Sequence, residues 1–271
     1  MMNEQIYLIG DVHGCYDTLL KLVEQLPKNA KLVFCGDLID RGPKSREVIA
    51  YIRNNNHKMV LGNHEKLMIE SGGLVIDPRD FQETDWGYNG GRETLSSYHE
   101  TDSLHADIDW LKTQPLYLIF DDYKDKMGRK LIVSHAPILD YFKYYIDVKE
   151  KVKNNDYTPH EYIDYKHTIR NSEMLMLWNR GIPHKEQTDF FNVCGHNPID
   201  SFIFDKDGNL KLDKSYITNN NTIFDNLKGY TNIDTGAVYK DKEYSKQFRG
   251  KLTALEFPSM KIYQQVNIDD Y

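Results

Sequence analysis

Seven polar residues with metal-binding or acid–base side chains stand where short apolar runs of the sequence end. They are Asp11, His13, Asp37, Asn63, His64, His135 and His196. Carboxylates and imidazoles together bind first-row divalent ions such as Mn²⁺, Fe or Zn²⁺. The amide oxygen of Asn63 adds a ligand to such a set without adding charge. The residue types therefore predict a metal site.

The positions of these residues predict two ions. Asp11 and His13 alternate along one extended segment and can face the same ion. The carboxylate of Asp37 can bridge two ions, with one oxygen on each. A second ion would then have the ligands Asp37, Asn63, His135 and His196. Two ions about 3.5–4 Å apart share a hydroxide and bind the oxygens of a phosphoryl group during in-line displacement. We therefore expect a phosphatase in which a dimetal-bound hydroxide attacks the phosphate.

Three further residues are expected to act on the substrate. His64 follows a metal ligand in the sequence, so its imidazolium can protonate the leaving alkoxide as a general acid. Asp40 is expected to hold that ring charged and oriented. Arg41 can form two parallel hydrogen bonds with phosphate oxygens. The sequence thus predicts an acid, its partner and a phosphate ligand beside the metals.

The elements that must position these residues form a strand-helix-strand pattern. Apolar runs without alternation, typical of strands buried on both faces, open the segments 6–14, 32–42, 59–65, 131–137 and 190–198. Residues 16–26, stopped by Pro27, and residues 45–54 have apolar side chains at helical spacing. This order predicts parallel strands, whose carboxyl ends share one edge of a sheet. The site is therefore expected at that edge of an α/β fold.

The rest of the sequence predicts additions to this core. Residues 71–107, with a tight loop at the glycine pair of GYNGG (87–91), are expected to form one cap-like insertion over the site. The Tyr-, Lys- and Asn-rich residues 137–189 are expected to form a second, helical one. Residues 251–257 and 261–266 predict strands, and with them a second sheet packed on the first. We find no repeat and no low-complexity linker, so residues 1–271 are interpreted as one domain.

Composition narrows the class of protein. The chain has 271 residues, 40% of them hydrophobic, and a net charge of −7, which argues against a nucleic-acid scaffold. It does not argue against a phosphorylated ligand, because a metal supplies local positive charge. Three cysteines without a CxxC motif are typical of a reducing cytoplasm. No apolar run is long enough for a secretory signal or a bilayer span. We therefore expect a cytoplasmic protein with no membrane partner.

The motifs around these residues resemble a known family. DVHG (11–14), GDLIDRG (36–42) and GNHE (62–65) resemble the GDxHG, GDxxDRG and GNHE patterns of the phosphoprotein phosphatase family of calcineurin-like metallophosphoesterases. SHA (134–136) and GHNP (195–198) resemble its two later histidine motifs, so the likeness runs from Gly10 to about Val238. The resemblance implies a four-layer α/β/β/α sandwich with a βαβαβ metal-binding core. It also implies metal roles for the six predicted ligands, an acid role for His64 and the roles given above to Asp40 and Arg41.

Other segments resemble the bacterial and phage serine/threonine phosphatase branch. WNR at residues 178–180 resembles a WxR element, which implies that Arg180 is a second phosphate ligand. Arg92 and Arg170 are the alternatives, both in the expected insertions. The SAPNY loop of eukaryotic members is absent, so arguments about their peptide groove do not apply. Asn197 stands where bacterial relatives often have Thr.

The function expected from these observations is hydrolysis of phosphate monoesters with two divalent ions, Mn²⁺ or else Fe or Zn²⁺. The partner is expected to be a phosphorylated protein, at phosphoserine or phosphothreonine, or a small phosphorylated metabolite. Tyr-rich insertions over the site could stack an adenine, but they have few Lys or Arg placed to hold a long polyphosphate, which favours the protein. The alternative enzyme is a symmetrical diadenosine tetraphosphate hydrolase. A non-catalytic binding module would leave the filled ligand positions and the acid unexplained.

Overall fold

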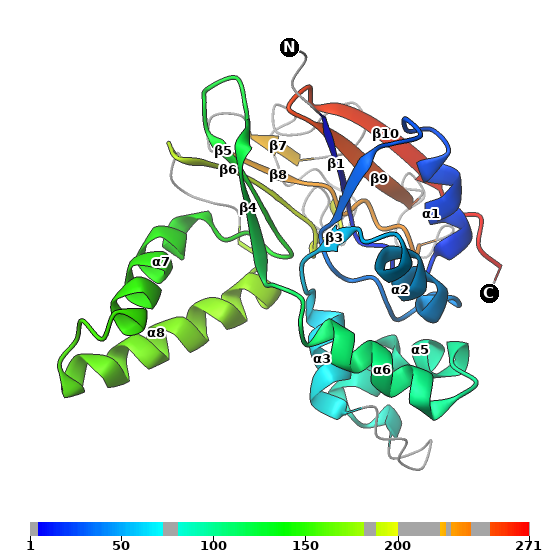
Figure 1. Cartoon of the computed structure of the whole chain (residues 1–271). Coiled ribbons are helices and arrows are strands. Elements are labelled where there is room, and N and C mark those ends of the chain that lie inside the picture. The colour runs from blue at the N-terminus through cyan, green and yellow to red at the C-terminus, as the bar shows by residue number, and fades with distance from the viewer. Residues whose placement is uncertain are drawn as a thin grey trace, which may run out of the picture.

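Two sheets lie face to face in the computed structural model of the chain (Figure 1). The structure describes residues 5–72, 81–181, 188–199, 223–225, 229–239 and 250–270. Across the first sheet the described strands run in the order β10 (Lys261–Val266), β9 (Lys251–Phe257), β1 (Ile6–Ile9), β2 (Lys31–Phe34) and β3 (Lys58–Met59). Across the second they run in the order β4 (Tyr117–Lys124), β5 (Lys130–Ser134), β6 (Phe190–Cys194), β8 (Tyr230–Asn232) and β7 (Ile223–Asp225).

The predicted strand-helix-strand core is confirmed. Strands β1, β2 and β3 are parallel, and the helices α1 (Tyr16–Val23) and α2 (Ser45–Asn54) connect them. Helix α1 ends earlier than the predicted residue 26. The amides of Gln25 and Leu26 bond to carbonyl groups three residues back, which tightens the chain into a final turn before Pro27. The two parallel connections bring the carboxyl ends of all three strands to one edge.

The C-terminal strands lie elsewhere than expected. They extend the first sheet, with β9 antiparallel to β1 and β10 at the edge, and the second sheet consists of other strands. The reason is burial on both faces of β9. Leu255 and Phe257 pack between the sheets, whereas Leu252 and Ala254 pack toward the helices on the opposite face. A strand that is apolar on both faces is suited to the interior of a sheet.

Apolar side chains from the facing sides of the two sheets form the central core. Ile6, Leu8 and Val33 of the first sheet meet Val133 and Phe191 of the second, and all five are at most 2% exposed. Burial of this kind stabilises a fold by about 25 cal/mol per Å² of apolar surface. The sheets are therefore stacked as the two inner layers of a sandwich.

Helices cover the two outer faces. A second apolar cluster joins the first sheet to α1 and α2, and to α3 (Asn63–Ser71) and α6 (Thr101–Leu111). A third cluster joins the second sheet to α7 (Leu139–Lys153) and α8 (Pro159–Trp178). The order helices, sheet, sheet, helices confirms the predicted four-layer α/β/β/α sandwich.

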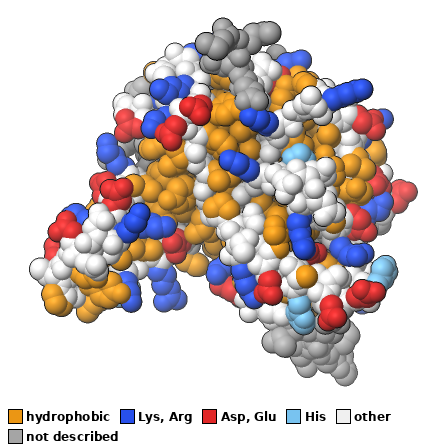
Figure 2. All heavy atoms as spheres, in the orientation of Figure 1, with side chains coloured by type: hydrophobic (Ala, Val, Ile, Leu, Met, Phe, Trp, Pro, Cys, Tyr) orange, Lys and Arg blue, Asp and Glu red, His pale blue; other side chains and the backbone are white. Residues whose placement is uncertain are grey.

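The segment 137–189 is helical over the part that the structure describes, as predicted, but its helices form an outer layer of the sandwich. Phe142 and Tyr145 of α7 and Met176 of α8 pack on Ile132 and Cys194 of the second sheet. The far end of this α7–α8 hairpin projects from the body (Figures 1 and 2). Within the described residues, no helix is long and apolar enough to cross a membrane.

The segment 71–107 contains a turn that differs from the expected loop. Residues Gly87–Gly91 form one wide helical turn, η1, which continues into α5 (Arg92–Ser97). Gly90 alone leaves helical geometry, at φ 98°, a conformation that a side chain would strain. That the segments 71–107 and 137–189 are insertions in one domain stays a prediction, and residues 73–80 and 182–187 of them lie outside the described residues.

Candidate dimetal site

The seven residues with predicted chemistry all follow strands and gather at one place. Asp11 and His13 follow β1, Asp37 follows β2, Asn63 and His64 open α3 after β3, and His135 and His196 follow β5 and β6. None of these side chains belongs to a residue more than 5% exposed. The strand ends of both sheets therefore build a single buried polar cluster.

The backbone of this cluster is strained. His13, Asp37, Asp40, Arg41 and His196 all have positive φ angles, between 47° and 72°. Such conformations cost about 1–3 kcal/mol each for residues other than glycine and persist where the surroundings over-determine them. Strain at five site residues indicates that the fold holds these side chains in place for chemistry.

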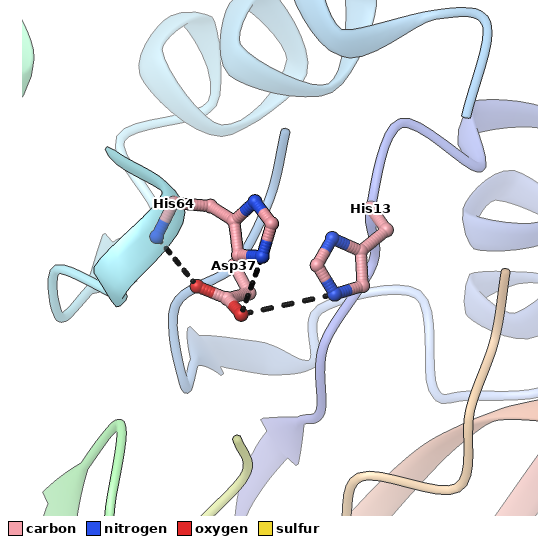
Figure 3. Close-up of side chains that lie close together, drawn as sticks. All are labelled: His13, Asp37 and His64. Carbon is pink, nitrogen blue, oxygen red and sulfur yellow. Dashed lines mark hydrogen bonds and ion pairs between the residues drawn. The ribbon is translucent and has the colours of Figure 1, made fainter. Parts of the chain in front are cut away.

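The first group of potential ligands consists of His13, Asp37 and His64, shown in Figure 3. Asp37 Oδ2 lies 3.7 Å from His13 Nε2 and 3.8 Å from His64 Nε2. The backbone amide of His64 donates to the other oxygen, Oδ1, at 3.1 Å. One edge of the Asp37 carboxylate thus faces two imidazole nitrogens.

The second group lies on the other side of Asp37. Asp37 Oδ1 is 3.3 Å from His135 Nε2, which is 2.9 Å from Asn63 Oδ1 and 3.1 Å from His196 Nδ1. The two oxygens of Asp37 therefore point toward different sets of ligand atoms. This is the arrangement that a carboxylate shared by two ions requires.

The donor atoms of this cluster fit cations. His13 Nδ1 donates to Ile39 O and His135 Nδ1 to Cys35 O, both at 2.9 Å, so each neutral ring turns the lone pair of Nε2 into the cluster. The guanidinium of Arg41 already donates to His13 Nε2, at 2.8 Å, which shows that a positive charge is accommodated there. The buried atoms Asp11 Oδ1 and His196 Nε2 have no hydrogen-bond partner in the part of the chain that the structure describes.

Burial and neighbouring charges set protonation states that suit metal ligation. Burial lowers the pKa of His13, His135 and His196, the last to about 2, so these rings are neutral. Burial, with the nearby Asp234, raises the pKa of Asp11. A cation beside Asp11 would offset that cost.

Asp11 lies at the border of the site. It belongs to neither group of closely spaced His and Asp ligand atoms. Its Oδ2 accepts a hydrogen bond from the backbone amide of His196 at 3.0 Å, and its Oδ1 lies against Gly195, where a side chain would collide with it. The structure thus places Asp11 beside His196, while its expected sharing of an ion with His13 stays a prediction.

His64 and Asp40 form a short, buried side-chain pair. His64 Nδ1 and Asp40 Oδ2 are 2.6 Å apart, and both residues are at most 1% exposed. Burial lowers the pKa of His64, but the carboxylates of Asp37 and Asp40 outweigh it and raise the pKa. Arg41 Nη2 lies 2.9 Å from His64 Nε2. The predicted phosphate ligand and the predicted acid are therefore in direct contact.

Arg180 reaches the opposite side of the cluster. It follows α8, and its Nη1 donates to Asn197 Oδ1 at 3.2 Å, next to His196. Its positive charge contributes to the lowered pKa values of His135 and His196. The alternatives Arg92 and Arg170 are exposed on α5 and α8. Arg180 is therefore the better placed of the three.

Sequence reasoning missed three residues that support the site. The buried carboxylate of Glu65 accepts hydrogen bonds from the amides of Asp37, Leu38 and Gly62, and burial raises its pKa to about 7. Its position three residues after Gly62 is the spacing of a helix capping box, a signal available in the sequence. Trp86 and Thr94 both donate to Asp40, from 46 and 54 residues away, and nothing local in the sequence indicates this.

Comparison with known proteins agrees with this geometry. The sequence matches the family of calcineurin-like phosphoesterases over residues 5–229. A relative from Erwinia tasmaniensis, named symmetrical bis(5'-nucleosyl)-tetraphosphatase, is 36% identical over 138 residues, which are 49% of this chain and 44% of that protein. A protein of the same name from Buchnera aphidicola is 37% identical over 141 residues, 50% of this chain and 45% of its own length. The matched region thus spans less than half the length of these curated relatives.

Solved structures share the fold at low sequence identity. A protein provisionally described as a diadenosine tetraphosphatase has a TM-score of 0.54 at 16% identity, covering 99% of this chain and 96% of its own. A metallophosphoesterase from Sphaerobacter thermophilus has a TM-score of 0.51 at 15% identity, covering 98% and 89%. The family match also confirms the enzyme class predicted from the motifs. On these grounds the chain belongs to the calcineurin-like phosphoesterase family.

Proposed function

We propose that the chain is a dimetal phosphoesterase that cleaves a dinucleoside tetraphosphate symmetrically. The observation that carries the dimetal assignment is the Asp37 carboxylate, whose two oxygens face two groups of imidazoles. Asp37, His13 and Asp11 would hold one ion, and the residues that would hold the other are Asp37, Asn63, His135 and His196. When bound, such ions supply Lewis-acid activation of water and of the phosphoryl group. Mn²⁺ is the ion we propose.

The side chains around this centre would bind the phosphate and protonate the leaving group. Arg41 and Arg180 approach from two sides and can bind the non-bridging phosphate oxygens through bidentate hydrogen bonds. His64 is placed to give the proton of Nε2 to the leaving oxygen, because Nδ1 is bonded to Asp40. Arg41 donates to His64 Nε2 in the structure, so it must turn toward the phosphate when a substrate binds.

The choice of substrate rests on the comparisons and on the packing of the α7–α8 hairpin. The relatives are named as tetraphosphatases, which favours the alternative expectation over hydrolysis of phosphoproteins. The argument for a phosphoprotein depended on Tyr-rich insertions above the site with few Lys or Arg placed to hold a polyphosphate. Tyr145 and Tyr165 are instead buried in the α7–α8 layer, with Tyr145 packed against the second sheet, so the composition of this segment no longer argues against a nucleotide.

A direct comparison of substrates tests this proposal. The Mn²⁺-loaded protein is assayed on diadenosine tetraphosphate and on a phosphoserine peptide, and products are separated by anion-exchange chromatography. We expect two molecules of ADP per tetraphosphate and a kcat/KM at least about tenfold above that of the peptide. The reverse order would identify a protein phosphatase. Turnover of neither substrate by protein with both metals bound would identify a binding module.

Two further expectations belong with this proposal. We infer that residues 1–271 form one domain, because the inter-sheet core joins strands from both ends of the described chain, among them β1 and β9. We also infer a cytoplasmic enzyme, in keeping with a nucleotide substrate and with three buried cysteines and no CxxC motif. Fractionation of cells that express the full protein would test the location.

A further inference from the structure

Asp40 is a completely buried carboxylate whose two oxygens both accept hydrogen bonds. Oδ2 faces His64 Nδ1 at 2.6 Å. Trp86 Nε1 donates to both oxygens, at 3.0 Å to Oδ1 and 3.2 Å to Oδ2, and the Thr94 hydroxyl donates to Oδ1 at 2.6 Å. Two donors from one distant segment thus offset the burial of this charge and set the direction of Oδ2.

The same segment holds the backbone at Asp40. The Asp40 amide donates to Thr94 Oγ1 at 2.9 Å, and the Arg41 amide donates to Gly90 O at 3.2 Å. Asp40 and Arg41 have φ angles of 71° and 69°. Residues 86–94, here called the 86–94 segment, therefore support both strained residues through side chains and backbone.

The donors in this segment are themselves fixed. Trp86 is 1% exposed and Thr94 is fully buried. The indole of Trp86 packs edge-on against Phe81 at 5.3 Å between ring centroids. It also lies directly against Gly91, where an added Cβ would be 2.6 Å from Nε1. A ring packed this closely on two sides keeps its N–H group aimed at Asp40.

We infer that Trp86 and Thr94 are positioning residues for the general acid, acting on His64 through Asp40. The terminal torsion of an aspartate has broad minima, so a carboxylate without fixed donors samples many directions. The N–H of Trp86 and the hydroxyl of Thr94 restrict the orientation of the Asp40 carboxylate, so that Oδ2 stays directed at His64 Nδ1. This inference rests on the proposed acid role of His64 and extends the site to Trp86 and Thr94, whose hydrogen bonds reach the acid through Asp40.

Proton NMR tests the inference without any substrate. The proton shared by His64 Nδ1 and Asp40 lies in a short, charge-assisted hydrogen bond and should give a downfield resonance in protein loaded with diamagnetic Zn²⁺. Its absence in His64→Gln assigns it. We expect Trp86→Phe and Thr94→Val to shift or broaden this resonance, whereas Thr94→Ser, which keeps the hydroxyl, retains it.

Leaving-group dependence supplies the kinetic readout. Phenyl phosphate and p-nitrophenyl phosphate have nearly the same shape, but phenolate is the more basic leaving group and depends more on an acid. We expect Trp86→Phe and Thr94→Val to lower kcat on phenyl phosphate by about tenfold and on p-nitrophenyl phosphate by less than about threefold. KM should change little, because neither side chain binds phosphate.

Two matched variants control for loss of an indole N–H or a hydroxyl elsewhere. Trp110→Phe removes an indole N–H on α6, and Thr113→Val removes a hydroxyl just after α6 that donates to Trp110 O instead of Asp40. Melting temperatures show which variants are folded. If Trp86→Phe does not fold, the comparison of Thr94→Val with Thr94→Ser still tests the inference.

The outcomes separate the inference from the proposed function. An unchanged resonance in folded Trp86→Phe and Thr94→Val overturns the inference, and so does an equal shift in the two controls. A shifted resonance with equal kinetic losses on both phosphates supports the positioning of the ring while it contradicts the acid role of His64. A shifted resonance with the selective loss supports both.

Discussion

Glu65 accepts a hydrogen bond from the backbone amide of Asp37, at 2.9 Å, although 28 residues separate them. The same carboxylate accepts the amides of Leu38 and Gly62 at 2.7 and 2.8 Å. Glu65 therefore ties the loop that carries the central aspartate to the start of α3, which carries Asn63 and His64. One buried side chain sets the spacing between both groups of ligands.

This relationship predicts an effect on metal affinity. In Glu65→Gln one oxygen becomes an NH₂ group, which faces backbone donors and cannot accept from them. We expect metal affinity to fall by about 10–100-fold, as for other groups that orient ligands. Isothermal titration with Mn²⁺ measures it. Glu70→Gln, an exposed change on the same helix, is the control, and equal affinities of the two variants would contradict the role of Glu65.

Asp37 and Asn63 differ in how many ions each is expected to touch. Asp37→Asn removes the charge shared by both groups of ligands, whereas Asn63→Ala removes an oxygen from one. We expect Asp37→Asn to retain less metal and less activity than Asn63→Ala. Elemental analysis of the purified variants gives the stoichiometry. Full metal content in Asp37→Asn would refute the bridge.

His64 should matter most for poor leaving groups. General acid catalysis contributes about 10²–10⁴-fold, and its share falls as the leaving group becomes less basic. We expect His64→Asn to lower kcat on phenyl phosphate within that range and distinctly less on p-nitrophenyl phosphate. Asp40→Asn should show the same selectivity in milder form. Equal losses on both substrates, with both metals retained, would mean that His64 positions the phosphate.

Removal of metal should abolish activity reversibly. The proposed ligands are neutral imidazoles, carboxylates and an amide, and a strong chelator can compete with them. We expect dialysis against EDTA to reduce phosphatase activity to background and added Mn²⁺ to restore it, with circular dichroism unchanged throughout. Full turnover by protein that elemental analysis shows to be metal-free would rule out the mechanism.

Much of the site could be predicted because its signals are local. Each apolar strand ends directly before its polar residues, and parallel strands place their carboxyl ends together whatever the details of packing. The convergence of Asp37 and Asn63 therefore followed from the sequence order alone, whereas His135 follows β5 of the second sheet and reaches them through the stacking of the two sheets. The four-layer sandwich also followed from the sequence, once the motifs were related to a family. The pairing of His64 with Asp40 followed from the same motifs.

Tertiary packing decided what no local pattern carries. Strand β9 is apolar on both faces, and its place beside β1 in the first sheet depends on how all the strands pack together. Tyr141 and Tyr145 of α7 pack against the apolar outer face of the second sheet. Trp86 and Thr94 reached Asp40 across 46 and 54 residues, through side-chain packing that depends on the whole fold. Sequence order determined which residues meet at the strand ends, and long-range burial decided which residues hold them there.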